Sequence, residues 1–326
     1  MFRRGVAQAT SSEGLRRPAA VARRVSLIVT RGLVKEFGPV RALGPLDLDM
    51  EPAAWGLVGP NGAGKTTLIL SLLGLARPTA GSVRVLGLDP TAVALDVRSR
   101  VGFVPEGDAY VPGYTGVGFV AFCGAVQGMR RADALGRAHE VLDYVGLGEA
   151  RYRKVSEYST GMRQRAKLAA ALVHDPELLI LDEPTNGLDP AGRKEMLALL
   201  RELAHEHRIP LLYASHVLPD VQEVCDRILI LDAGRARFQG PTETLLAAAE
   251  RSYDVSLRGD AERVAALLRA KGVEVSAPEP GRLRVVLPAS GAERLVLEAV
   301  AEADATLRRF VRVSHDLEEG FAEALA

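Results

Sequence analysis

The residues best suited to chemistry lie in one run, Gly59 to Thr67. The run follows the apolar segment 54–58 and precedes the amphipathic segment 68–73, so we predict a strand, a glycine-rich turn and a helix. Glycines let backbone N–H groups point at an anion, and the start of a helix attracts the same charge. The run therefore predicts a phosphate-binding loop made of Gly59, Pro60, Asn61, Gly62, Ala63, Gly64, Lys65, Thr66 and Thr67.

Two side chains of this loop can act on a bound triphosphate. The Lys65 ammonium can reach the β- and γ-phosphates, and the Thr66 hydroxyl can ligate Mg²⁺. The alternative is an ordinary glycine-rich turn between a strand and a helix. The flanking segments have the context that the motif requires, which favours the phosphate loop.

A second group of polar residues follows two largely apolar segments, 178–181 and 211–215. Each segment is typical of a buried strand in a parallel sheet, and the carboxyl ends of such strands border the ligand crevice. Asp182 suits the outer shell of Mg²⁺, and Glu183 suits the attacking water as general base or positioning group. His216, after the second strand, can reach a γ-phosphate, although a single histidine is more often structural.

Three weaker signals have both a functional and a structural interpretation. Glu106 follows the predicted strand 101–104 and either faces the ligand crevice or is a solvated loop charge. Ser159 is placed to cap a helix, and with Gly161 it could form a second anion site. Phe37 precedes a turn and is either a core residue of a small sheet or a stacking platform for a purine ring.

Composition limits the class of protein. The 326 residues suit about two domains, and Lys+Arg and Asp+Glu balance at 41 each, which argues against a nucleic-acid binder. Cys123 and Cys225 are too far apart for a metal or redox motif, as expected in a reducing compartment. The longest uncharged run, 109–129, is too rich in glycine for a transmembrane helix, so a membrane role needs a separate partner chain.

The first 24 residues contain six arginines and one acid, Glu13, without an apolar core, so they are not a secretory signal. We interpret them as a disordered tail or as the product of an upstream start codon, with a weak contact to anionic lipid headgroups as the alternative.

The remaining segments alternate between strand and helix patterns. We predict turns at Gly38-Pro39 and Gly44-Pro45, a hairpin centred on Gly234, and a linker from Gly240-Pro241 through a helix over 242–250. The helix predicted over 115–127 carries an apolar face that either packs within its own domain or meets another chain. Further strands are predicted at 25–33, 46–50, 82–86, 227–231 and 235–239, and further helices at 132–145 and 191–205.

Residues 252–326 differ from the rest because they show no chemical constellation. The pattern predicts strands at 253–257, 273–275, 283–287 and 307–313, and helices at 261–270, 292–303 and 317–324. This is a small α+β module, whose default role is regulatory or dimerising.

Taken in order, these motifs resemble the ATP-binding subunits of ABC transporters. The resemblance runs from about Val25 to Leu246 and rests on the phosphate loop, the Glu106 loop, the signature Tyr158 to Arg165, the strand acids, the Asp189 turn and His216. More narrowly, the phosphate loop, Tyr-Ser-Thr-Gly-Met-Arg-Gln-Arg and Glu-Pro-Thr-Asn-Gly-Leu-Asp-Pro look like the single-domain ATPases of drug, lipid and polysaccharide exporters.

The resemblance implies a fold and a division into domains. The expected fold is an α/β P-loop NTPase with a doubly wound sheet, an antiparallel β-subdomain and a helical insertion, followed by the small α+β module. The implied domains are a basic tail at 1–24, an ATP-binding domain at 25–247 with the insertion at about 107–165, and an accessory domain at 252–326.

The resemblance also implies a mechanism that uses ATP and Mg²⁺. Two copies would face each other head to tail and close over two ATP molecules, with Ser159 and Gly161 of one copy touching the γ-phosphate held by Lys65 of the other. Asp189 would lie at the dimer seam, and Glu106 and the insertion would meet a separate permease at the cytoplasmic face of the cell membrane. In this arrangement Phe37 stacks on adenine, Thr66, Asp182 and Glu106 serve the metal, and Glu183, His216 and Lys65 are catalytic.

Three residues depart from the general family pattern. Glu106 replaces a glutamine, which adds charge near phosphate, and Thr160 and Met162 replace a glycine and a glutamine of the signature. Two rival functions remain: a soluble ABC ATPase acting on ribosomes or DNA, and a regulatory or immunity module without transport. The transported substrate is not encoded here, because that specificity would lie in the permease.

Overall fold

The computed structural model describes residues 26–244, 252–288 and 292–312. The predicted tail at 1–24, the predicted final helix at 317–324 and most of the predicted helix over 242–250 lie outside the described residues.

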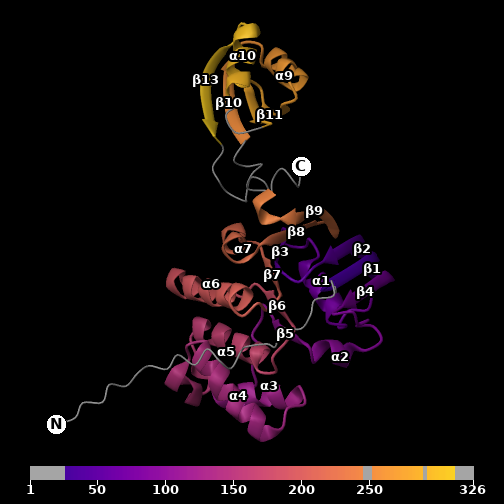
Figure 1. Ribbon diagram of the computed structural model, residues 1–326, viewed down its shortest axis with the longest axis vertical. Helices are drawn as coiled ribbons and strands as arrows, with labels where there is room; N and C mark the ends of the chain where they lie inside the picture. The colour runs from indigo at the N-terminus through magenta and orange to yellow at the C-terminus, as the bar shows by residue number, and fades with distance from the viewer. Residues whose placement is uncertain (1–25, 245–251, 289–291, 313–326) are drawn as a thin grey trace, which may run out of the picture.

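The central element is a six-stranded sheet with the order β5-β6-β7-β3-β8-β9 (Figure 1). All neighbouring strands are parallel except β9, which returns antiparallel beside β8. The carboxyl ends of the parallel strands therefore meet at one edge, as predicted for the strands that carry the acids. The strands are β3 (Ala54–Val58), β5 (Val101–Val104), β6 (Leu178–Asp182), β7 (Leu211–Ser215), β8 (Arg227–Asp232) and β9 (Arg235–Pro241).

Side chains of this sheet alternate between two cores, because successive residues of a strand point to opposite faces. In β3, Ala54 and Val58 belong to the core with the larger group of helices, whereas Trp55 and Leu57 belong to the core with α1 (Lys65–Leu72) and α2 (Ala94–Arg98). The larger group comprises α3 (Gly116–Val126), α4 (Arg131–Tyr144), α5 (Thr160–Leu172), α6 (Pro190–His205) and α7 (Leu218–Val224).

A three-stranded antiparallel sheet, β2-β1-β4, shares the core of α1. Its strands are β1 (Ile28–Phe37), β2 (Val40–Met50) and β4 (Ala80–Val85). The turn at Gly38-Pro39 is present, but the turn predicted at Gly44-Pro45 is wrong, because both residues lie inside β2. Gly44 has φ 140°, and a Cβ there would lie 2.8 Å from the Val34 side chain, so glycine serves close strand packing at this point.

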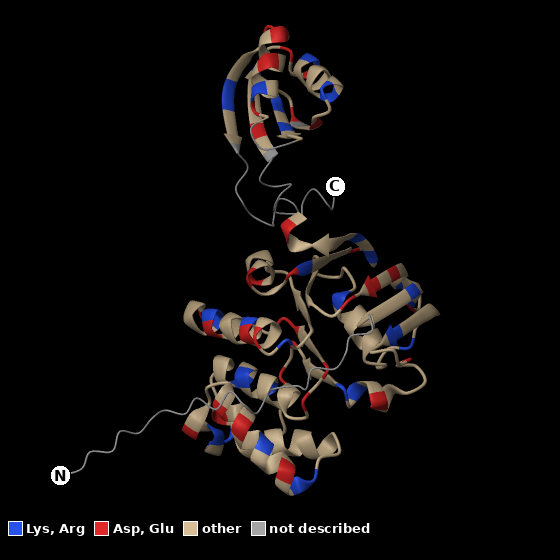
Figure 2. Ribbon diagram, in the orientation of Figure 1, with Lys and Arg blue, Asp and Glu red and all other residues tan. Residues whose placement is uncertain are grey.

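The helical insertion follows β5 and matches the predicted helices within one or two residues. Thr115 caps α3 by accepting a hydrogen bond from the Gly118 N–H, and two short 3₁₀ turns, η2 (Gly148–Tyr152) and η3 (Val155–Glu157), lead to α5. Helices α2 and α7 were not predicted, since both are short and their apolar residues show no full helical period. Gly240-Pro241, predicted to open a linker, instead closes β9. Acidic and basic residues mix along α4 and α6 (Figure 2), in keeping with the balanced net charge.

Residues 252–288 and 292–312 form an antiparallel sheet with the order β11-β12-β10-β13 and two helices on one face (Figure 1). This βαββαβ arrangement is the ferredoxin-like topology, with its own apolar core. The elements are β10 (Ser252–Arg258), α9 (Ala261–Ala270), β11 (Glu274–Glu279), β12 (Arg282–Val286), α10 (Arg294–Glu302) and β13 (Thr306–Arg312).

Candidate nucleotide-binding site

The predicted phosphate loop connects β3 to α1. Gly64 precedes the helix with φ 103°, and a Cβ at this residue would lie 2.6 Å from the Ala42 carbonyl oxygen, so only glycine fits. No described side chain caps α1, and its first turn carries no acid. The first N–H groups of the helix thus remain available to an anion from outside the chain.

Lys65 is buried at the start of α1, with 8% of its surface exposed. Its Nζ donates to the carbonyl oxygens of Gly59, at 2.6 Å, and Pro60, at 3.3 Å. Burial lowers the pKa of this amine, and nearby carboxylates, Glu183 foremost, oppose the drop. The ammonium is therefore held over the loop by neutral acceptors, and a phosphate would be a stronger partner.

Asp182 lies at the end of β6 and meets α1. The Thr66 Oγ1 donates to Asp182 Oδ2 over 3.2 Å, so the two predicted metal-binding side chains are neighbours. Burial raises the pKa of Asp182, and the charges of Glu106 and Glu183 add to the increase, whereas the bond from Thr66 opposes it. A carboxylate that is costly to ionise here would be stabilised by a cation.

Glu183 joins the ends of β6 and β7. One oxygen, Oε1, lies 3.0 Å from the His216 backbone nitrogen and 2.8 Å from its Nδ1, and Oε2 accepts from the Ser215 hydroxyl over 3.2 Å. The backbone of Glu183 has φ 48°, a left-handed conformation that is uncommon outside glycine. Strain of this kind is frequent at functional sites, where surrounding contacts hold it.

A lysine that was not predicted from the sequence holds the Glu106 loop. Lys167 of α5 donates to the carbonyl oxygens of Pro105, Glu106 and Gly107 at 2.7, 3.2 and 3.0 Å. Asn186 Nδ2 lies 3.4 Å from Glu106 Oε1. The side chain of Glu106 is thereby placed near the acids of β6, since its charge affects the pKa of both Asp182 and Lys65.

Asp220 of α7 is a second residue that was not predicted, and only 2% of its surface is exposed. Its Oδ2 accepts from the Thr185 hydroxyl over 2.8 Å and from the Tyr213 hydroxyl over 3.2 Å. Its Oδ1 accepts from Arg193 Nε over 2.8 Å and forms an ion pair with Nη2 of the same arginine over 2.7 Å.

This buried carboxylate connects three segments that carry predicted site residues. Thr185 follows Glu183 by two residues, Tyr213 precedes His216 by three, and Arg193 lies on α6, which begins after Asp189. A lone aspartate among apolar residues gives no sequence signal for such a role, because its partners are set by tertiary packing.

Ser159, Gly161 and Asp189 form a separate group. Ser159 caps α5 by accepting from the Met162 N–H over 3.3 Å, and Asp189 caps α6 by accepting from the Gly192 N–H over 2.9 Å. The two helix starts are adjacent, because a Cβ at Gly161 would lie 3.7 Å from the Leu188 side chain. Since α5 and α1 cover opposite faces of the sheet (Figure 1), the fold separates this group from the phosphate loop of the same chain.

Phe37 ends β1 and is 50% exposed, with the Lys35 ammonium 4.5 Å from the ring centre. Of the two interpretations, burial in the core of the small sheet is wrong. The stacking role stays a prediction.

A groove opens between the insertion and the core of α1. It has a volume of about 350 Å³ and is mostly apolar, and α3 lines it with Phe122, Cys123 and Val126. Phe122 and Val126 are 42% and 69% exposed, so the apolar face of α3 is only partly covered by its own domain. The groove also reaches Pro105, next to the Glu106 loop.

Within the described residues no group of three His, Cys, Asp or Glu side chains could hold a metal by itself. Thr66 and Asp182 supply adjacent oxygen ligands, which fits Mg²⁺ when substrate phosphates complete its coordination. Among the helices that the structure describes, none combines the length and apolar character needed to cross a bilayer.

Comparison with known proteins gives concordant matches. The family model described as "ABC transporter" matches residues 43–186. The chain is 35% identical over 272 residues to an uncharacterized ABC transporter ATP-binding protein, YxlF, of Bacillus subtilis strain 168, covering 82% of this chain and 89% of that protein. It is 38% identical over 296 residues to the daunorubicin resistance ATP-binding protein DrrA3 of Streptomyces coeruleorubidus, covering 86% and 92%.

Solved structures show the same fold. The cbiO1 subunit of a Clostridium perfringens ABC transporter complex superposes with a TM-score of 0.62 at 24% identity, over 68% of this chain and 91% of that one. The dimeric ATP-binding cassette MJ0796, bound to ADP and phosphate, superposes with a TM-score of 0.60 at 24% identity, over 66% and 98%.

Proposed function

The chain belongs to the family of ABC transporter ATP-binding proteins, and from this premise we propose that it hydrolyses ATP to power an exporter. Relatives support the direction of transport by their names, which include a daunorubicin/doxorubicin resistance protein and a Nod factor export protein. In this proposal the protein works as a head-to-tail dimer. It acts on a separate membrane permease, and thus at the cytoplasmic face of the membrane.

The observation that carries the proposal is the meeting of the phosphate loop with the ends of β6 and β7. Thr66 contacts Asp182, and Glu183 contacts His216. In the proposed reaction the loop amides and Lys65 hold the triphosphate, and Glu183 orients and deprotonates the water that attacks the γ-phosphorus in line. His216 lies beside that carboxylate and steadies the water and the γ-phosphate.

Mg²⁺ fits this site through Thr66 and Asp182, with Glu106 nearby. Bound there with the nucleotide, it would neutralise charge on the β- and γ-phosphates. The extra acid at Glu106 makes the site more negative and so increases its dependence on the cation.

The position of the signature residues supports the dimer. Ser159 and Gly161 are exposed or partly exposed at the start of α5, on the face of the sheet opposite α1. A helix start with free N–H groups is an anion site. A two-fold copy can bring this helix start over the nucleotide that the first chain holds, and Asp189 then lies at the seam.

The groove beside α3 supports the permease partner. An exposed apolar surface within a balanced, charged surface is typical of a protein-binding site. A short amphipathic helix of a permease loop would bury Phe122 and Val126 there, and the groove's contact with Pro105 would link that helix to the Glu106 loop.

Hydrolysis is tested with Glu183→Gln, which keeps the size and the hydrogen-bond acceptor but removes the base. We expect the ATPase rate to fall by about a hundredfold or more while ATP affinity stays within about twofold, because the carboxylate acts on the water. Glu140→Gln, an exposed change on α4, is the matched control and keeps full activity. Unchanged hydrolysis by Glu183→Gln would falsify the assignment.

The permease is tested by asking whether the chain, isolated from the membranes of cells that produce it, copurifies with a polytopic membrane protein. We expect Phe122→Asp to abolish the association without changing the basal ATPase rate, since the groove lies outside the nucleotide site. Leu135→Asp, at a 47% exposed apolar residue on α4, serves as the control. Equal retention of both variants would rule out this docking surface.

A further inference from the structure

The small C-terminal module has one uncovered sheet face. Tyr253, Val255 and Leu257 of β10 are buried in the core with the two helices, so Asp254 and Ser256 between them point to the other face. No described element packs on that face (Figure 1).

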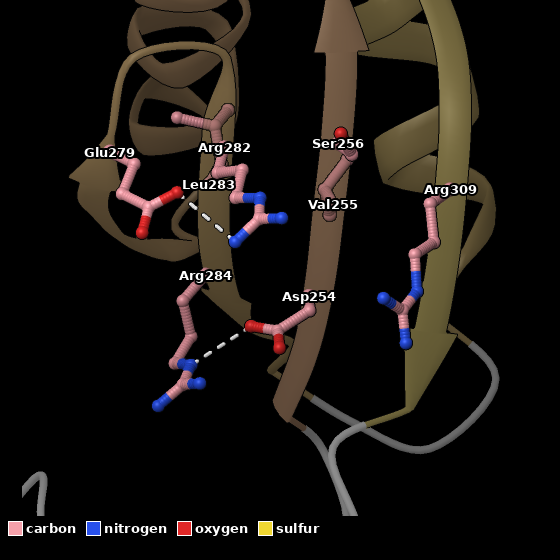
Figure 3. A pocket seen from close by; sticks show the side chains of 8 residues that line it. All are labelled: Asp254, Val255, Ser256, Glu279, Arg282, Leu283, Arg284 and Arg309. Atoms are coloured by element: carbon pink, nitrogen blue, oxygen red, sulfur yellow. Dashed lines mark hydrogen bonds and ion pairs between the residues drawn. The ribbon is translucent and has the colours of Figure 1, made fainter.

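A hollow of about 240 Å³ lies on this face, and Ser256 of β10 is one of the residues that line it (Figure 3). Strand register places Arg282 of β12 directly opposite Ser256 on one side and Arg309 of β13 opposite it on the other. Side chains on neighbouring strands at the same level are about 5 Å apart at Cβ, so two arginine side chains begin on either side of the Ser256 side chain. Their guanidinium groups extend along the strands towards the level of Asp254 (Figure 3). Arg284 of β12 lines the same hollow two residues after Arg282, opposite Asp254.

The hollow has an excess of positive charge. Arg284 Nε donates to Asp254 Oδ1 over 3.0 Å, and Arg282 pairs with Glu279 over 3.0 Å. The guanidinium group of Arg309 forms no hydrogen bond or ion pair with any described residue, and Figure 3 shows it extending along the hollow. Three arginines against two acids leave one guanidinium for an outside anion.

We infer that this hollow binds a phosphate monoester. Arginine presents a planar fork of N–H donors that matches phosphate oxygens. A tetrahedral phosphate has oxygens in several directions, so it can accept from Arg309, from Arg282 and from the Ser256 hydroxyl at once, whereas a carboxylate has two coplanar oxygens. The volume lies below the range of about 300–1,000 Å³ for drug-sized ligands, which suits a head group of this size.

The test uses the full chain with ADP and Mg²⁺ at saturation, so that the phosphate loop contributes equally in every variant. Calorimetric titration with phenyl phosphate represents a soluble monoester, and flotation with vesicles containing phosphatidic acid represents the same group on a lipid. We expect Arg309→Gln to weaken binding to the probe by tenfold or more. ADP affinity and melting temperature should stay unchanged, because Arg309 is exposed.

The matched control is Arg308→Gln, which removes the same charge from the adjacent, exposed residue of β13 that does not line the hollow. Full binding by this variant supports the site, and the probe that responds to Arg309→Gln identifies a soluble or a lipid source. Equal losses in both variants, equal affinity for benzoate, or no binding of either probe by the unaltered chain would overturn the inference.

Discussion

Asp182 is a carboxylic acid with 3% of its surface exposed, next to two further acids and one buried lysine. Burial is the largest cause of its raised pKa, so the folded protein binds this proton more tightly than the unfolded chain does. Its contribution to the free energy of unfolding therefore falls as the pH rises from the unfolded value of 3.8 through the raised folded value. Above the raised folded pKa, where Asp182 is ionised, its buried charge destabilises the nucleotide-free protein.

We predict that Asp182→Asn raises the melting temperature of the nucleotide-free protein at pH 7. Each kcal/mol relieved raises it by about 2–4 °C in a domain of this size. The difference should shrink towards pH 4, where the aspartate becomes protonated. As the pH falls, the stability that Mg²⁺ and ATP add should also fall, because protonation neutralises the carboxylate that we propose for the cation. Differential scanning calorimetry over this pH range measures both effects.

Asp49→Asn is the control, because the pKa of Asp49 is shifted in the opposite direction to that of Asp182. Hydrogen bonds from Ser26 and Arg31 lower the pKa of Asp49, so its ionised form is the stabilised one. Because the group lies at the surface, solvent screens the effect and the change in melting temperature should be small. A lower melting temperature for Asp182→Asn at pH 7 would contradict the burial argument.

At the scale of single residues, the sequence predicted best those side chains whose position follows from a motif or from the end of a buried strand. Asp182 and Glu183 were predicted at the crevice because a buried parallel strand must end there, and Thr66 was predicted near the metal from its motif. Lys167 was missed because its partners lie 60 or more residues away. Asp220 was missed because two of its three partners, Arg193 and Thr185, lie 27 and 35 residues away and only packing brings them together.

At the scale of elements, Asp220 is where α6, α7, β6 and β7 are held in one arrangement. The carboxylate binds Thr185, Tyr213 and Arg193, which lie on three segments that carry predicted site residues. We expect this network to hold Glu183 in place relative to His216, because Thr185 and Tyr213 lie two and three residues from them. Positioning errors of about 1 Å can cost up to about a hundredfold in rate.

We predict that Asp220→Asn lowers kcat by about ten- to a hundredfold and leaves ATP affinity within about twofold, because orientation is lost but the phosphate loop is intact. Steady-state hydrolysis and equilibrium ATP binding, both measured well below the melting temperature, separate the two effects. Tyr213→Phe removes one donor to the same carboxylate but keeps the ion pair with Arg193, so its effect should be smaller. A parallel loss of kcat and of binding capacity would instead indicate unfolded protein.

Helices and strands were predictable where the sequence shows a full run of apolar residues or a helix-capping residue. The caps Thr115 and Ser159 and strands β5 and β7 lie where the sequence placed them. The turn at Gly44-Pro45 failed because those residues usually mark turns, whereas here the glycine permits close contact with Val34 inside a strand. The element types of the C-terminal module were predicted, but its strand order follows from pairings that no local pattern encodes.

At the scale of the molecule, the two faces of the six-stranded sheet carry different halves of the proposed site. The phosphate loop and α1 belong to one core and the signature helix α5 to the other. Each chain therefore offers a nucleotide cradle and, elsewhere, a helix start that can complete the cradle of a second copy. In the proposed dimer, two-fold symmetry would yield two equal sites.

This arrangement predicts how one charge at the start of α5 acts. In the Glu183→Gln background, ATP should convert the 34.9 kDa chain into a dimer, because trapped nucleotide holds the two copies together. Adding Ser159→Asp keeps an oxygen acceptor for the helix cap but places a negative charge against the partner's γ-phosphate. We expect a monomer that still binds ATP with unchanged affinity, as measured by analytical ultracentrifugation and nucleotide titration.

Ser156→Asp is the matched control, because it adds the same charge to an exposed serine three residues earlier. The control should dimerise with ATP as the parent does, since η3 lies outside the proposed seam. A dimer that persists with Ser159→Asp would remove this helix start from the shared site. The sheet separates α5 from α1, so Ser159 should not affect ATP binding within its own chain. Loss of ATP binding by the monomer would contradict this separation.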